Sequence, residues 1–283
     1  MGVLTAFHKV KGRSPVVSGL FYPDDRAEMG TRIRALGLKR GVGGRASAII
    51  APHGAWDFSG SVAATAFSAA AGRANEVSRV VILGNVHRME EPGVFFSDSH
   101  YFDTPLGRLP VDMELSESLA SCSTLFEVND IPHLQEIAVE VLLPLTQFCF
   151  PGAAIVPILM GGAQPWLISA LARALRIILE PIMDSTLLVV SANVSIHDDE
   201  KAARLGAETC IQLLEENRIG DFISGIYDGR ISSCGASLIA SLLESGLMAD
   251  KPARLVTGPL VSARGELGDT TYYAGIAFES ICI

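Results

Sequence analysis

Residues 79–84 read RVVILG, a run in which four consecutive aliphatic side chains lie between an arginine and a glycine. Residues 46–51 (ASAIIA), 154–160 (AIVPILM) and 186–191 (TLLVVS) have the same nearly unbroken apolar character. Strands of a parallel sheet are covered by helices on both faces, so they read as continuous Val, Ile and Leu runs rather than alternating ones. The four runs therefore predict buried parallel strands.

Segments with helical character separate these runs. They cover residues 60–71, 137–149 (with Pro144 as a kink or boundary), 165–179, 200–216 and 234–244, and two late strands are predicted over residues 255–261 and 272–278. This alternation predicts an α/β fold with a mostly parallel central sheet flanked by helices. No internal repeat or low-complexity linker interrupts it, so we expect one domain over residues 1–283.

The composition argues against several classes of function. Of the 283 residues, 49% are hydrophobic and 19% are charged, as in globular proteins. Mean hydropathy is high at +0.35, but Pro, Gly or charged residues interrupt every long apolar stretch, so no membrane span is expected. A net charge of -9 without a Lys/Arg cluster argues against nucleic acid as a partner. The N-terminal residues contain no apolar signal segment, so we expect a cytoplasmic location.

Polar side chains follow three of the predicted strands. His53, His87 and Asn193 come two, three and two residues after the runs ASAIIA, RVVILG and TLLVVS. In open α/β sheets, ligands bind beyond the carboxyl ends of the strands. If the three strands are neighbours, these side chains converge on one rim of the sheet.

A thiol is a fourth candidate for this site. The five cysteines include no CxxC pair, which argues against a zinc ribbon. Cys234 lies in SSCGASLIASLL, where Ser232 or Ser233 as N-cap would place the thiol in the first helical turn and favour the thiolate. Two imidazoles and one thiolate suit iron, copper or zinc, so His53, His87 and Cys234 are predicted metal ligands. Alternatively, the histidines are hydrogen-bonded strand-end residues and the cysteine packs as a small apolar side chain.

Several motifs, in order along the chain, resemble those of the Memo family. They are RSPVVSGLFYP (13–23), PHGAWDFSG (52–60), LGNVHR (83–88), YFDTPLGRLPVD (101–112) and EIAVEVLLP (136–144), followed by the pair Cys234 and Gly235. The resemblance extends from about residue 13 to residue 279. The Memo family includes prokaryotic members that form component B of the AmmeMemoRadiSam set.

The resemblance implies a fold similar to that of the class III extradiol ring-cleaving dioxygenases, which use a non-haem iron at the corresponding rim. In Memo proteins the equivalent site has two histidines and a cysteine and is associated with iron or copper. By position these residues are His53, His87 and Cys234. The resemblance therefore implies a mononuclear, redox-active iron or copper pocket, with zinc or an empty site as alternatives, and a radical-SAM protein as partner.

The chain departs from the family pattern around this site. Asn193 replaces an aspartate, and Ile196, Ile137 and Arg88 each replace a histidine. These changes remove groups that could act as general acids or bases. We therefore do not expect cleavage of a catechol-type ring. Asn193, as a hydrogen-bonding group, and His197, one residue beyond a lost histidine, remain the candidate catalytic residues.

Two further side chains are candidate ligand contacts. Trp56, three residues after His53, is predicted either to form the wall of a ligand pocket or to brace the loop. His133 is predicted to lie at the rim of the pocket or to have a structural role. Two other functions stay open: a non-catalytic adaptor that binds a phosphopeptide or small molecule in the same cleft, and a thiol enzyme with Cys234 as nucleophile.

Overall fold

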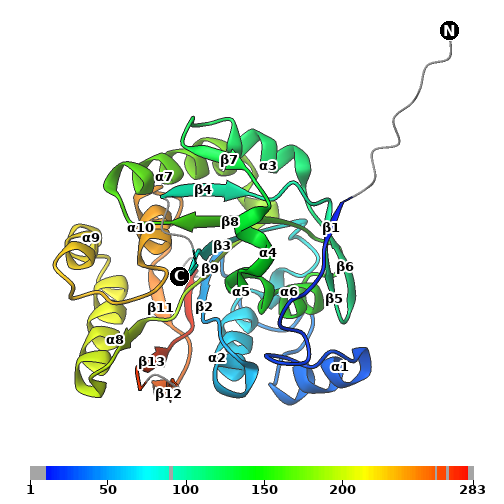
Figure 1. Cartoon of the computed structure of the whole chain (residues 1–283), viewed down its shortest axis with the longest axis horizontal. Coiled ribbons are helices and arrows are strands. Elements are labelled where there is room, and N and C mark those ends of the chain that lie inside the picture. The colour runs from blue at the N-terminus through cyan, green and yellow to red at the C-terminus, as the bar shows by residue number, and fades with distance from the viewer. Residues whose placement is uncertain (1–10, 89–91, 259, 266–267, 280–283) are drawn as a thin grey trace, which may run out of the picture.

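An eight-stranded sheet forms the centre of the protein (Figure 1). The computed structural model describes residues 11–88, 92–258, 260–265 and 268–279. At the centre, β2, β9, β3 and β8 lie parallel to one another, whereas β14 and β4 run antiparallel to their neighbours β2 and β8. The predicted α/β fold with a mostly parallel central sheet is confirmed. In spatial order the strands are β11 (Ala253–Leu255), β14 (Ile276–Phe278), β2 (Ala48–Ala51), β9 (Thr186–Ser191), β3 (Arg79–Asn85), β8 (Ala154–Gly161), β4 (Gly93–Phe96) and β7 (Phe126–Val128).

Alternate residues of each central strand face opposite layers of helices, because successive side chains of a strand point to opposite faces. Val81 and Leu83 of β3 belong to the apolar cluster on one face, and Val80 and Ile82 belong to the cluster on the other. All four side chains are buried. Double-sided burial explains why this strand reads as a continuous apolar run.

No helix in the described part of the chain has the length and apolar character needed to cross a membrane. A short helix, α4 (Ile131–Gln135), precedes α5 (Ile137–Glu140).

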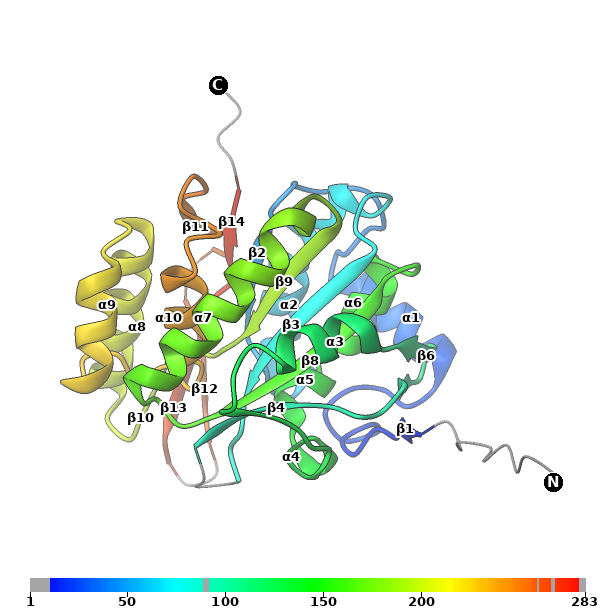
Figure 2. The same ribbon diagram turned by 90° about the horizontal axis from the view of Figure 1, so that it is seen from above.

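Helices cover both faces of the sheet (Figure 2). The face of Val81 carries residues from α3 (Met113–Ala120), α7 (Pro165–Leu179), α8 (Glu200–Glu215), α9 (Ile219–Tyr227) and α10 (Ala236–Glu244). The face of Val80 carries residues from α1 (Arg26–Ala35), α2 (Trp56–Ser68), α5 (Ile137–Glu140) and α6 (Leu143–Cys149).

Two three-stranded sheets accompany the central one. The first consists of β1 (Gly12–Arg13), β5 (Tyr101–Thr104) and β6 (Gly107–Pro110). The second consists of β10 (Ser195–His197), β13 (Thr270–Tyr273) and β12 (Val261–Arg264). Since β10 follows β9 after three residues, the second sheet extends from the end of a central strand.

Several predicted boundaries differ from the structure. The helix predicted over residues 60–71 begins four residues earlier, at Trp56, and ends at Ser68. The segment 137–149 is divided between α5 and α6, with Pro144 in the first turn of α6. Proline is tolerated there because the N–H it lacks has no partner within the helix.

The two late strands were predicted less well. The strand over residues 255–261 is wrong, because β11 ends at Leu255 and β12 begins only at Val261. The strand over residues 272–278 is interrupted, and its halves β13 and β14 pair in different sheets. At the interruption, a Cβ on Gly275 would lie 3.1 Å from the Cβ of Ala66 in α2, so a larger residue would fit only if the helix moved by a few tenths of an ångström.

A buried ion pair joins the N-terminal segment to α5. Arg13 Nη1 lies 2.8 Å from Glu140 Oε2, and the two side chains are 4% and 1% exposed. Glu140 also accepts hydrogen bonds from the backbone N–H groups of Val16 and Val17 and from the hydroxyl of Tyr22. One carboxylate therefore fixes the fold of the segment that carries the motif RSPVVSGLFYP.

We expect Glu140→Gln to destabilise the protein strongly, because it leaves the Arg13 charge buried without a partner. Removal of one member of a buried pair typically costs about 3–5 kcal/mol. Urea unfolding followed by circular dichroism measures the change in the free energy of unfolding. Glu208→Gln, which breaks the exposed Arg204–Glu208 pair, should leave the stability nearly unchanged, and equal effects of the two changes would contradict the role assigned to Glu140.

Candidate metal centre

Parallel pairing brings the carboxyl ends of three central strands together. Ala51, the last residue of β2, is the register partner of Ser191, the last residue of β9, and Leu83 of β3 pairs with Val190. The segments that leave these strands carry His53, His87 and Asn193. The expected convergence therefore occurs, because β9 lies between β2 and β3 in the sheet.

Two of these side chains form a cluster with a thiol. One ring nitrogen each of His53 and His87 and the sulfur of Cys234 all lie within 4.8 Å of one another, so the cluster could bind a metal ion. The two imidazole rings meet edge to face, with centroids 5.1 Å apart and an interplanar angle of 78°. Three residues far apart in the sequence are thus brought to one point.

Hydrogen bonds fix the orientation of the His53 ring. His53 Nδ1 lies 2.8 Å from Ser191 Oγ, and Ser191 Oγ donates its only proton to the carbonyl of Ala138 at 2.5 Å. Ser191 must therefore accept a proton from His53 Nδ1, which leaves Nε2 to face the thiol. His53 Nε2 lies 3.4 Å from Cys234 Sγ.

A carboxylate orients the His87 ring in the same way. His87 Nδ1 lies 2.9 Å from Glu136 Oε1, and the backbone N–H of His87 donates to Oε2 at 2.8 Å. Burial alone would lower the pKa of His87, but hydrogen bonds to Cys234 and Glu136 outweigh it and raise the pKa to about 10. The same interaction with His87 helps to hold the pKa of the Glu136 carboxyl below its usual range, against the effect of burial.

The setting of Cys234 differs from the predicted one. α10 begins at Ala236 with Gly235 as its N-cap, so the thiol lies in the turn before the helix and not in its first turn. Burial raises the pKa of the thiol, but the His53 and His87 rings and the Asn193 N–H outweigh it and lower the pKa to about 5. The backbone N–H of Asn193 donates to Sγ at 3.2 Å. The neighbouring rings, rather than a helix start, favour the thiolate.

Gly235 allows this turn to approach β9. A Cβ at this position would lie 2.5 Å from the Cβ of Ala192 and 3.1 Å from the carbonyl oxygen of Ser191. Any larger residue would push the turn, and Cys234 with it, away from the rim. In the pair Cys234–Gly235, the cysteine supplies the thiol and the glycine allows the close packing against β9.

The two candidate catalytic residues lie in different surroundings. Asn193 Oδ1 accepts the backbone N–H of His53 at 3.1 Å, so its side chain ties the His53 loop to the end of β9. His197 is exposed on β10, and its Nδ1 accepts a hydrogen bond from the N–H of Asp199 at the start of α8. Asn193 contacts the cluster through its backbone N–H, which donates to Cys234 Sγ. His197 lies outside the cluster.

The two candidate ligand contacts are both buried. Trp56 Nε1 donates to the carbonyl of Val141 at 3.0 Å, and the ring packs at a tilt against Tyr22, with centroids 5.8 Å apart. His133 Nε2 donates to the carbonyl of Phe95 at 3.1 Å, and burial lowers its pKa to about 4. These contacts support a structural role for His133 and bracing of the loop by Trp56, although Trp56 also lines a pocket together with Tyr22 and Asp57, so both predictions for it stay open.

The structure adds two residues to the site that the sequence reasoning missed. Glu136 and Ser191 hold the outer nitrogens of the two histidine rings, so they decide which nitrogen faces the thiol. Glu136 is the first residue of the motif EIAVEVLLP, and Ser191 is the last residue of the run TLLVVS. Both residues therefore stand in stretches that the sequence analysis had already singled out. Only the three-dimensional structure shows which histidine each of them contacts.

The fold and the site define an α/β protein with a two-histidine, one-cysteine cluster at the carboxyl ends of its parallel strands. Its sequence matches the family described as Memo-like protein over residues 13–257. The chain belongs to the Memo family.

Similar proteins cover nearly the whole chain. A MEMO1 family protein of Thermotoga neapolitana is 30% identical over 275 residues, covering 93% of this chain and 97% of that protein. A MEMO1 family protein of Pyrobaculum aerophilum is 30% identical over 282 residues, covering 94% and 98%. The crystal structure of an uncharacterized protein from Escherichia coli K12 matches with a TM-score of 0.49 at 12% identity, over 82% of this chain and 98% of that protein. This similarity is too low to support an argument about function.

In metal-free protein, we expect iodoacetamide to alkylate Cys234 at a nearly constant rate from about pH 8 to about pH 6 and more slowly below about pH 5. The thiolate is the reacting form, and a pKa of about 5 keeps it populated above that pH. Peptide mapping by mass spectrometry measures the rate at each cysteine. Cys149 and Cys210, whose pKa values burial raises to about 12, serve as slow controls. A rate that falls about tenfold per pH unit below pH 8.5, as for an ordinary thiol, would contradict this.

Proposed function

We propose that this protein binds one iron or copper ion through His53, His87 and Cys234, and that the ion makes it a redox-active member of the Memo family. The observation that supports the proposal is the cluster itself, in which two imidazole nitrogens and one sulfur lie within 4.8 Å of one another. Imidazole and thiolate ligands also suit zinc, which would give a site without redox chemistry.

The dimensions of the cluster suit a single ion. Bonds of about 2.0 Å to nitrogen and 2.3 Å to sulfur, at angles of about 105–120°, separate the two ligand atoms by about 3.4–3.7 Å. His53 Nε2 and Cys234 Sγ are already 3.4 Å apart. Since the widest separation is no more than 4.8 Å, side-chain movements of about 1 Å bring all three atoms to bonding distance of one point.

The hydrogen bonds behind the rings are those expected of metal-binding histidines. Such histidines commonly donate their second N–H to a carboxylate or another oxygen, which fixes the tautomer and makes the ligand nitrogen more basic. Glu136 does this for His87, and Ser191 does it for His53. The low pKa of Cys234 supplies the thiolate that a metal requires, and a bound ion would displace the proton that a pKa of about 10 keeps on the His87 ring.

The residues around the cluster favour ion binding and electron transfer over proton transfer. Asn193 has no proton-accepting group, and its amide oxygen is occupied by the N–H of His53. Both oxygens of Glu136 accept hydrogen bonds from His87, so this carboxylate is committed to orienting the ring. A bound ion would supply one-electron chemistry and open coordination positions, while the protein holds the rings and the thiolate in place. Cleavage of a catechol-type ring is not part of the proposal.

We expect protein purified without a histidine tag to retain close to one iron or copper ion per chain, and His87→Ala to lose it. Glu136→Gln should weaken binding by about 10–100-fold, as is typical when the partner of a ligating histidine is lost. Metal analysis after competition with a chelator measures both changes. His197→Ala is the matched control, since this exposed histidine lies outside the cluster. Unchanged metal content in His87→Ala would refute the assignment.

The redox part of the proposal has its own test. Copper-loaded protein should show a thiolate-to-copper charge-transfer absorption and a reversible one-electron wave in voltammetry, because thiolate and imidazole ligands support copper redox chemistry. Cys234→Ser should abolish the absorption. A protein that retains zinc in preference to iron and copper, and shows no such wave, would limit the function to metal binding.

A further inference from the structure

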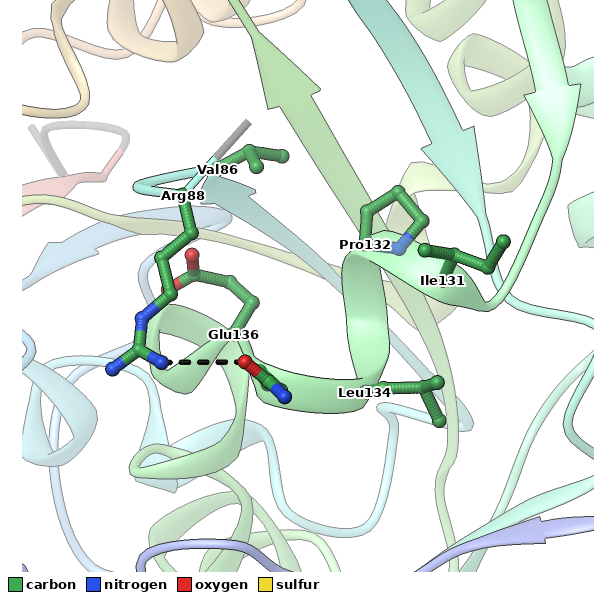
Figure 3. Close-up of a pocket in the computed structure, with 7 residues that line it drawn as sticks. Val86, Arg88, Ile131, Pro132, Leu134 and Glu136 are labelled. Atoms are coloured by element: carbon green, nitrogen blue, oxygen red, sulfur yellow. Dashed lines mark hydrogen bonds between the residues drawn. The ribbon is translucent and has the colours of Figure 1, made fainter. Parts of the chain in front are cut away.

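A pocket of about 270 Å³ lies between α4 and the segment that follows β3 (Figure 3). This volume is just below the range of about 300–1,000 Å³ that is typical for drug-sized ligands, so the pocket suits a small molecule. Its lining residues are Val86, Arg88, Ile131, Pro132, Leu134, Gln135 and Glu136.

One side of this pocket presents hydrogen-bond donors. Arg88 Nη1 donates to the side-chain oxygen of Gln135 at 3.3 Å, as the dashed line in Figure 3 shows. Because the Gln135 oxygen is used in this way, its amide group offers N–H donors, as does the rest of the guanidinium. The oxygens of Glu136 already accept several N–H groups, two of them from His87. This side therefore offers N–H donors to a ligand group that accepts hydrogen bonds, such as a carboxylate, whose negative charge the Arg88 guanidinium can balance.

The opposite side of the pocket is apolar. Ile131, Pro132 and Leu134 of α4 lie across from Arg88 in Figure 3. Ile131 and Leu134 are 69% and 51% exposed, which is unusual for neighbouring large apolar side chains. Exposed apolar surface beside a cavity is typical of a binding site.

The pocket adjoins the metal cluster. His87 lies between Val86 and Arg88 in the chain, and both of these neighbours line the pocket. Glu136 forms part of the pocket wall and also holds Nδ1 of the His87 ring at 2.9 Å. A ligand in the pocket therefore contacts the residues that orient one arm of the cluster.

We infer that this pocket binds a small carboxylate with a short apolar chain. The carboxylate pairs with Arg88 and Gln135, and the chain packs on Ile131, Pro132 and Leu134. Through Glu136 and His87, occupancy of the pocket is coupled to the metal cluster; this coupling, but not the binding itself, rests on the proposed function. An amine of the same length fits less well, because it offers no acceptor to the N–H groups of Arg88 and Gln135, and the oxygens of the Glu136 carboxylate already accept N–H groups of the chain.

Hexanoate and hexylamine are suitable probes, with binding measured by saturation-transfer NMR and by calorimetry on the full chain. Hexanoate should bind the wild-type protein, and hexylamine should not. Arg88→Gln should weaken hexanoate binding about tenfold or more, as expected for the loss of hydrogen bonds to a charged group. Leu134→Asn should also weaken it. Arg204→Gln and Leu205→Asn, on the exposed face of α8, are the matched controls and should bind as the wild type does.

Three results would overturn the inference: no binding of hexanoate to the wild type, equal binding to Arg88→Gln, or equal binding of hexylamine. Since Arg88 and Leu134 are exposed, their variants are expected to fold, and unfolding curves that match the wild type verify this. The same samples separate the two proposals. If hexanoate binds but no metal does, only the proposed function fails; if metal binds but hexanoate does not, only the pocket assignment fails.

Coupling to the cluster is tested on copper-loaded protein. Hexanoate should shift the thiolate-to-copper absorption of the wild type, and Arg88→Gln should need a hexanoate concentration about tenfold higher or more for the same shift. A spectrum of the wild type that does not respond to bound hexanoate would show that the pocket and the cluster are independent, which overturns the coupling.

Discussion

The register of three parallel strands is the constraint on which the site depends. β9 lies between β2 and β3, and its last residue, Ser191, is paired with Ala51. A slip of one residue in this pairing would turn every side chain of a strand to the opposite face. It would exchange the side chains that face the two helix layers and turn Ser191 away from the ring of His53. Helices on both faces enforce the register, because each strand must fit apolar layers above and below it.

The cluster depends on a second layer that reaches back to the N-terminal segment. Arg13 donates to the carbonyl oxygens of His133 and Glu136, in addition to its ion pair with Glu140. Glu136 in turn caps α5 through the N–H groups of Ile137 and Ala138 while it holds His87. The stability of α5 and the orientation of one candidate metal ligand are therefore parts of a single hydrogen-bond network.

The sequence predicted the central sheet well because its strands are buried on both faces. The runs RVVILG and TLLVVS became β3 and β9 almost residue for residue, and the helix over residues 165–179 has the predicted bounds. The strands near the C-terminus were harder for two reasons. β12 is largely exposed, so no apolar run marks it. β13 and β14 are both buried and lie close together in the sequence, so the sequence does not reveal that they pair in different sheets. Boundaries were also misjudged where packing overrides local preference, as at Cys234, where the close approach of Gly235 to Ala192 delays the start of α10.

At the candidate site too, the sequence could not show contacts between residues that are far apart in the chain. His53 and His87 stood out because they follow the carboxyl ends of two predicted buried strands, where ligands bind in open α/β sheets. Their partners Glu136 and Ser191 could be identified only from three-dimensional contacts. The helix-start argument pointed to Cys234, which does lie in the cluster, but the argument itself was wrong because α10 begins only at Ala236. The Cys234 thiolate is favoured by two rings that come from other strands, an effect that no local sequence pattern records.

Two of the departures from the Memo pattern make the surroundings of the cluster more positively charged. Replacing an aspartate by Asn193 removes a negative charge from the loop beside His53, and replacing a histidine by Arg88 adds a permanent positive charge next to His87. A divalent ion held by the Cys234 thiolate, with the Glu136 carboxylate behind His87, would be close to neutral by simple count. An aspartate in place of Asn193 would make such a site anionic, and Arg88 shifts it the other way. If the cluster binds metal as proposed, both changes favour an anionic ligand next to it, because they make the local electrostatic potential more positive and leave His53, His87 and Cys234 unchanged.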